Sequence, residues 1–167
     1  MTDPFAVLGL PRAFDLDPAA LDARVRELAR RLHPDRFARA APAERAAALA
    51  RATAVNDAKR AVRHWPSRTA HLLALAGHDP APAGAAEPEL LLRQLELRER
   101  LEAGDPAVVA ELRRRLATLE GEVRAAFADP GWTAPAPAGR IARLLAEARF
   151  VERALGDVAH SIRSSRA

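Results

Sequence analysis

The residues whose types and spacing best suit chemistry are His33, Pro34 and Asp35, which follow one another in the stretch RRLHPDRF. Proline has a fixed φ, lacks a backbone N–H and disfavours helical geometry in the residue before it, so a helix that reaches His33 must stop there. We expect the tripeptide to project from a helix end and to expose the Asp35 carboxylate beside basic residues. That arrangement suits docking on a partner that offers an arginine. An ordinary helix stop, with His33 near the negative end of the helix dipole, is the alternative interpretation.

Other catalytic and metal chemistries have little support in the sequence. The chain has no cysteine, which excludes thiolate metal sites and a cysteine nucleophile. His64, His71 and His78 recur every seven residues, but seven helical residues rise ~10 Å, too far for one metal ion. No nucleophile lies beside a base in a pattern that predicts a pocket. We therefore predict neither an enzyme nor a metal or cofactor site.

The charge pattern argues against nucleic acid as a partner. The net charge is +4, and Lys59 is the only lysine among 26 basic residues. The isoelectric point of about 11 therefore mostly reflects arginine, which does not titrate until very alkaline pH. Clustered basic residues with interleaved aromatics, typical of nucleic-acid binding, are missing. No apolar run approaches the ~20 residues of a membrane helix, and MTDPFAVLGLPRAF lacks the pattern of a secretory signal, so we expect a cytoplasmic protein.

The elements that must position the tripeptide are helices. Aromatic residues are only 4% of the chain, so a core must be built from Leu, Ala and Val, which favours an all-α fold. Asp-Pro pairs at 3–4, 17–18 and 105–106 predict capped helix starts, and Gly9 predicts the first helix end. Leu21, Val25, Leu28 and Leu32 form one apolar stripe, with Arg26 and Arg30 on the opposite side. This second helix should end near residues 31–33.

The third helix should run from Pro42 to about Trp65 and pack against the second as an antiparallel hairpin. We expect Pro66 to end it and Ser67 to cap a short fourth helix, RTAHLLALAG. The segment 77–88 is rich in proline and is the predicted linker between an N-terminal domain, 1–76, and a C-terminal helical bundle, 89–167. In that bundle the predicted helices span about 89–103, 106–128 and 140–162, and short connections favour an antiparallel three-helix arrangement.

The helix predicted at 89–103 carries two apolar stripes instead of one. Leu90, Leu97 and Leu101 share one side, the expected core face. Leu91, Leu92 and Leu95 lie on another side, beside charged residues. A second stripe indicates a binding surface, or else two neighbouring helices that bury both stripes. Periodicity alone favours the second of these interpretations.

The N-terminal half resembles the J-domain family. The segments FAVLGLP, RRLHPDRF and VNDAKRAVRHWPSRTAHLL occur in the family's order. The resemblance implies a J-domain hairpin whose His-Pro-Asp loop and basic second helix bind a DnaK-type chaperone and stimulate its ATPase. The residues that this resemblance assigns to chaperone binding are His33, Pro34, Asp35, Arg26, Arg30 and Arg36.

The C-terminal half resembles the HscB branch of that family in QLELRE and LLAEARFVERAL. The resemblance implies delivery of an IscU-type iron–sulfur scaffold protein to a DnaK/HscA-type chaperone, with no cofactor on this chain. Some eukaryotic members carry a cysteine-pair metal motif, which this chain lacks. The implied scaffold-binding residues are Leu91, Leu92, Leu95, Glu96, Arg98, Glu99 and Phe150. The alternative is a J-domain protein whose C-terminal bundle serves a different client.

Overall fold

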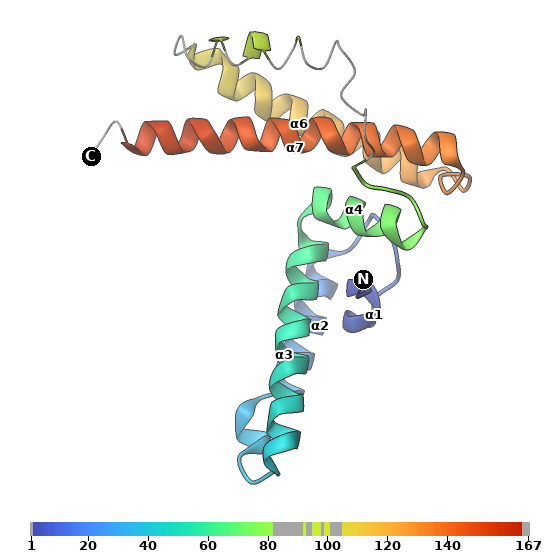
Figure 1. Ribbon diagram of the computed structural model, residues 1–167, viewed down its shortest axis with the longest axis vertical. Coiled ribbons are helices and arrows are strands. Elements are labelled where there is room, and N and C mark those ends of the chain that lie inside the picture. The colour runs from blue at the N-terminus through green and yellow to red at the C-terminus, as the bar shows by residue number, and fades with distance from the viewer. Residues whose placement is uncertain (1, 82–91, 93–94, 98, 101–104, 165–167) are drawn as a thin grey trace. The chain divides into compact units, whose positions relative to one another are not determined.

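The computed structural model describes residues 2–81, 92, 95–97, 99–100 and 105–164 (Figure 1). All regular elements in these ranges are helices, which confirms the predicted all-α fold. The chain divides into two compact units, Met1–Leu75 and Ala76–Ala167. The helices are α1 (Pro4–Leu8), α2 (Pro18–Arg31), the 3-10 helix η1 (Pro34–Phe37), α3 (Pro42–Arg63), α4 (Trp65–Leu75), α6 (Pro106–Ala128) and α7 (Pro135–Ser164).

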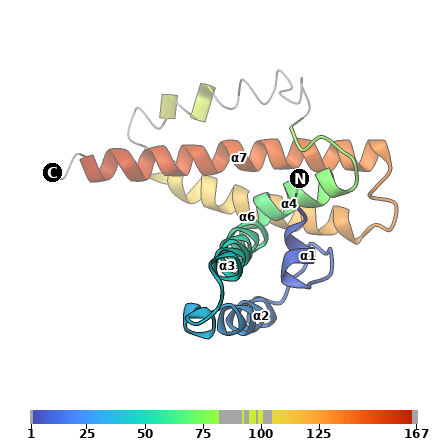
Figure 2. The ribbon, with the colours of Figure 1, turned by 60° about the horizontal axis from the view of Figure 1, so that its bottom comes forward.

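The N-terminal unit is built around the pair of α2 and α3, which Figure 2 shows side by side and nearly end on. The pair is antiparallel, because Asp22 near the start of α2 contacts Arg63 at 3.0 Å and Lys59 at 3.4 Å near the end of α3. The helix α1 packs mainly on α3. The helix α4 follows α3 directly in the chain and also contacts it. The core combines side chains from all four helices and one loop, among them Phe5, Phe14, Leu21, Val62 and Leu73.

The predicted helix starts at Asp-Pro pairs are confirmed. The carboxylates of Asp3, Asp17 and Asp105 each accept a backbone N–H in the first turn of the helix that follows, and proline occupies the next position. Proline costs little there, since first-turn N–H groups have no partner within the helix. Gly9 ends α1 in the left-handed region at φ 64°, which only glycine adopts without strain.

Two predicted helix starts are wrong, both because of proline. Pro66 does not precede α4 but lies in its first turn, where the helix begins at Trp65, and the Arg68 N–H donates to the His64 carbonyl at 2.9 Å. Ser67 is therefore not the cap, and α3 ends at Arg63 because His64 is extended. Likewise α7 begins at Pro135 instead of Arg140. In both helices the proline occupies a position whose N–H would have had no partner.

The C-terminal unit pairs the long helices α6 and α7, which run in opposite directions on either side of the turn at 129–134 (Figure 1). Their shared core consists of fully buried side chains: Val108, Leu112, Leu119, Val123, Ile141 and Leu145. The predicted helix at 89–103 is helical at residues 92, 95–97 and 99–100, and its other residues lie outside the described ranges. The predicted linker 77–88 is described only as far as Ala81.

Candidate functional site

The loop at His33–Asp35 is fixed by its own backbone. His33 is the N-cap of η1, Pro34 is its first residue, and the Arg36 N–H donates to the His33 carbonyl at 3.0 Å. The His33 side chain is 58% exposed and that of Asp35 is 89% exposed. A carboxylate presented this openly on a fixed turn can accept hydrogen bonds from an arginine or lysine of a partner.

The imidazole of His33 has a capping role in this loop. Its Nδ1 accepts the Asp35 N–H at 3.3 Å, and the same nitrogen lies 3.4 Å from Asp35 Oδ2. One nitrogen cannot accept the N–H and donate to the carboxylate at the same time. We favour the cap, because it completes the first turn of η1 and an ion pair this exposed contributes little. The Asp35 carboxylate is then available to accept a hydrogen bond from a side chain of a partner protein.

The basic side of α2 lies where the sequence pattern predicts it. Leu21 and Val25 are buried, whereas Arg26 and Arg30 are exposed on the other side, and Arg36 is exposed in η1. Within the described ranges no carboxylate lies within ion-pair distance of these three guanidinium groups. The neighbouring Arg24 differs, since its Nη1 binds Glu27 at 2.7 Å and thereby lowers the pKa of that carboxyl group.

The second candidate surface lies on the helical residues around 92–100. Leu92 and Leu95 are 61% and 56% exposed. Glu96 and Glu99 are exposed beside them, and Leu97 is half-buried. The predicted site residues Leu91 and Arg98 lie outside the described residues. Exposed leucines flanked by carboxylates form a surface suited to a partner with an apolar contact and a basic rim.

A groove of about 500 Å³ runs beside this surface, between the 96–100 segment, α6 and α7. Glu96 and Phe150 both line it, so the structure brings two of the predicted scaffold-binding residues together from distant parts of the sequence. Leu97, Leu112 and Val151 supply further apolar lining. Phe150 is half-buried, which leaves part of its ring available for contact.

Two ion-pair networks border the groove, and sequence reasoning missed both. Arg115 of α6 binds Glu147 of α7 through Nε at 2.7 Å and through Nη2 at 2.8 Å, and it also contacts Glu122. The paired Glu147 raises the pKa of Arg115. Arg115 and Glu147 are 32 residues apart, so no local spacing predicts the pair.

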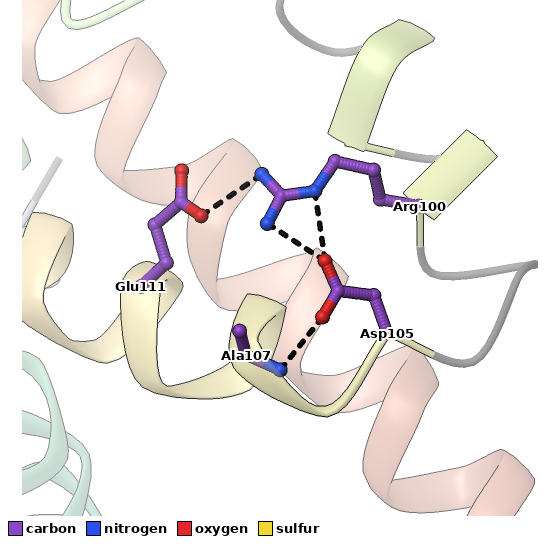
Figure 3. A network of polar contacts seen from close by, with 4 residues as sticks. All are labelled: Arg100, Asp105, Ala107 and Glu111. Atoms are coloured by element: carbon purple, nitrogen blue, oxygen red, sulfur yellow. Dashed lines mark hydrogen bonds and ion pairs between the residues drawn. The ribbon is translucent and has the colours of Figure 1, made fainter.

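The second network joins the 96–100 segment to α6 (Figure 3). The guanidinium of Arg100 lies between two carboxylates, Asp105 and Glu111. The Ala107 N–H and Arg100 lower the pKa of the Asp105 carboxyl group. The two acidic partners of Arg100 lie 5 and 11 residues further along the chain, and these spacings are not those of neighbours on one helix.

The described ranges contain no cluster of three or more His, Cys, Asp or Glu residues that could hold a metal ion. In the same ranges no helix is both long and apolar enough to cross a membrane.

Two solved structures that are similar to this chain are both HscB proteins. No family model matches the sequence. Among solved structures, the chaperone HscB from Vibrio cholerae is 27% identical, with a TM-score of 0.77 over 98% of this chain and 99% of that one. The human co-chaperone protein HscB is 24% identical, with a TM-score of 0.83 over 96% of this chain and 82% of that one, a likeness of fold. The resemblance to HscB that the sequence predicts is thus confirmed at the level of structure.

Proposed function

We propose that this chain, whose solved structural neighbours are HscB co-chaperones, is itself a cytoplasmic, non-enzymatic J-domain co-chaperone. Its N-terminal unit stimulates the ATPase of a DnaK/HscA-type chaperone. Its C-terminal unit binds an IscU-type scaffold protein and delivers it to that chaperone, which promotes iron–sulfur cluster transfer. The cluster is cargo carried by the scaffold, and no step requires a cofactor on this chain.

The observation that carries the proposal is the exposed Asp35 carboxylate on a turn held by its own backbone. With 89% of its side chain exposed, this carboxylate does nothing for the core of the unit. The exposed Arg26, Arg30 and Arg36 give the same region a positive field, which steers an acidic partner surface toward it. A carboxylate within a basic region lets the partner's arginine be recognised at one defined point.

The C-terminal contribution rests on Leu92, Leu95 and the groove beside them. Two leucines left more than half exposed cost the free protein favourable burial, which a partner can recover on binding. The adjoining groove, with Glu96 and part of Phe150, extends the same surface. In the cycle that we propose, this surface holds the scaffold, the His33–Asp35 loop docks on the ATP state of the chaperone, and hydrolysis locks the chaperone onto the scaffold.

The first experiment measures steady-state ATP hydrolysis by the cognate chaperone with this protein and the scaffold. Asp35→Asn should lower the stimulation about tenfold or more, because it removes the charge from a charge-assisted contact. The matched control is Asp57→Asn, which removes the charge of an exposed carboxylate on α3 that pairs with Arg60 of the same helix. Equal stimulation by wild type and Asp35→Asn would contradict the proposed docking loop.

The second experiment tests the scaffold-binding surface by calorimetric titration of the scaffold. Leu95→Ala combined with Phe150→Ala should weaken binding about tenfold or more, in the range of interface anchor residues, and leave stimulation without scaffold unchanged. The control is Leu49→Ala, because Leu49 is 68% exposed and lies in the other unit. Chaperone stimulation with no scaffold binding by the wild type would keep the J-domain part and point to a different client.

A further inference from the structure

The scaffold-binding surface proposed above lies on residues 92, 95–97 and 99–100 of the C-terminal unit. Among its described residues, Leu92, Leu95, Glu96 and Glu99 are exposed. A surface segment that is not held in place must be ordered by its partner, and that ordering lowers the affinity. The contacts that hold this segment therefore bear on how well it binds.

Arg100 makes the strongest polar contacts of this segment that the structure describes. Its Nε and Nη2 donate to the same oxygen of Asp105, at 3.0 and 2.8 Å, and its Nη1 donates to Glu111 at 2.9 Å. The Arg100 carbonyl also accepts the Asp105 N–H at 3.1 Å. The side-chain contacts of Arg100 with α6 and its cap are drawn in Figure 3. Together with the backbone bond, they connect Arg100 to the start of α6.

The anchor for these contacts is itself fixed. Asp105 is the N-cap of α6, and its second carboxylate oxygen accepts the Ala107 N–H at 2.9 Å. The helix α6 is in turn packed on α7 through buried residues such as Val108 and Leu112. Arg100 therefore links the segment to the rigid part of the unit.

We infer that Arg100 is a positioning residue: by binding the α6 cap Asp105 and Glu111, it holds the segment so that Leu92 and Leu95 are ordered before the scaffold arrives. The inference rests on the proposed function. Arg100 contributes through Asp105 and not through contact with the scaffold. Exposed ion pairs are individually weak, so the expected change in scaffold affinity is about fivefold, smaller than for the leucines themselves.

A cycle of variants separates positioning from direct contact. Arg100→Gln should weaken scaffold binding about fivefold, and Asp105→Asn should weaken it similarly, since asparagine still caps α6 but lacks the charge. The double variant should be no weaker than either single one. Arg100→Lys keeps the charge but loses the planar guanidinium that donates two hydrogen bonds to Asp105. It should therefore bind the scaffold better than Arg100→Gln but less tightly than the wild type. Arg113→Gln, an exposed arginine of α6 outside the groove, is the control and should bind as wild type.

A second readout needs no scaffold. Because the chain has no cysteine, a single Glu99→Cys variant accepts one nitroxide label at an exposed position of the segment. Electron paramagnetic resonance of the full chain should show a more mobile label at position 99 after Arg100→Gln. A label on Ala117→Cys, exposed on α6, should show the same mobility in both backgrounds.

The outcomes are distinct. Unchanged label mobility at position 99 after Arg100→Gln overturns the positioning role, whatever the scaffold does. Fully additive losses for Arg100→Gln and Asp105→Asn also overturn it, because they indicate that Arg100 touches the scaffold. If the wild type does not bind the scaffold but the label at 99 responds, the proposed function fails while the role of Arg100 in ordering the segment stands.

Discussion

The two units are both helical, and arginine side chains help to hold each unit together, partly through different acceptors. In the N-terminal unit, Arg63 pairs with Asp22 between α3 and α2, and two other arginines bind backbone carbonyls near helix ends: Arg24 Nε donates to the Leu8 carbonyl at 2.8 Å, and Arg68 Nη1 donates to the Val62 carbonyl at 2.7 Å. In the C-terminal unit, the guanidinium of Arg115 joins α6 to α7 by binding the carboxylate of Glu147.

Helix length explains the contact that Arg24 makes at the end of α1. A five-residue helix such as α1 is far too short to be stable alone, so its ends must be held by caps and by backbone acceptors. The helices α6 and α7 have 23 and 30 residues, and only their relative register needs fixing. The His33–Asp35 loop is held by a backbone hydrogen bond and by the His33 cap, and it leaves the Asp35 carboxylate exposed. In the C-terminal unit, the side chain of Arg100 binds Asp105 and Glu111 of the neighbouring helix start.

Each unit contains one of the two tryptophans, so the comparison can be tested separately in each. Trp65 packs edge-on against Phe14 with ring centroids 6.4 Å apart, and Trp132 packs against Phe127 at 4.8 Å. In a Trp132→Phe background the fluorescence reports the N-terminal unit, and in a Trp65→Phe background it reports the C-terminal one.

The largest expected effect comes from a cavity in one core. Leu145→Ala empties a fully buried position of α7 and should destabilise the C-terminal unit by about 3 kcal/mol. Urea unfolding should show an earlier Trp132 transition and an unchanged Trp65 transition. Leu73→Ala, fully buried in α4, is the mirror control and should move only the Trp65 transition. Equal shifts of both transitions would mean that the two units unfold as one.

The next effect is specific to the turn contacts of the N-terminal unit. Gly9→Ala places a side chain at φ 64°, where its Cβ would also meet Arg24 Nη2 at 2.8 Å. Arg24 can move away, but doing so disturbs its contact with the Leu8 carbonyl. The expected loss is about 1–2 kcal/mol in the Trp65 transition. A neutral Gly9→Ala would show that the end of α1 tolerates rearrangement, against the argument from short helices.

The same substitution should have the opposite sign in the C-terminal unit. Gly121 lies inside α6, and a Cβ there meets nothing within 4 Å. Alanine removes the entropic cost of glycine in a helix, so Gly121→Ala should stabilise the Trp132 transition by about 0.5–1 kcal/mol. Destabilisation by Gly121→Ala in thermal unfolding would indicate that this part of α6 needs the glycine.

Local signals in the sequence predicted much of the fold and one of the two candidate sites. The Asp-Pro starts at residues 3, 17 and 105 follow from adjacent residues alone, and so does the exposure of the tripeptide after α2. The predicted starts of α4 and α7 are wrong because proline disrupts the interior of a helix but fits its first turn. The sequence alone does not tell whether a given proline ends one helix or begins the next.

The parts that could not be predicted depend on packing between distant residues. Arg115 meets Glu147 only because α6 and α7 are antiparallel with one particular register. The residue pattern alone does not place Glu96 and Phe150 in one groove; only the family resemblance groups them. The exposure of Leu92 and Leu95 was also undecided, since two apolar stripes fit either a binding surface or a helix between two neighbours. The structure leaves both leucines largely exposed, which is the condition for the first interpretation.

The smallest expected effect is a pH dependence confined to the N-terminal unit. Burial lowers the pKa of His71 in α4, with Asp3 opposing the shift, and no described group bonds its buried Nδ1. The unfolded chain holds its proton up to pH ~6.5, so the folded state binds fewer protons just below that value. Stability is therefore full above pH ~6.5 and falls as the pH drops toward the lowered pKa of the folded state.

His71→Gln tests this dependence, because glutamine does not titrate. Between about pH 7.5 and 5.5, where carboxylates stay ionised, the Trp65 urea midpoint of the wild type should fall more than that of the variant. The Trp132 midpoint should respond to pH identically in both proteins, because His71 lies outside the C-terminal unit. Parallel Trp65 responses in wild type and His71→Gln would remove the burial of His71 from the explanation.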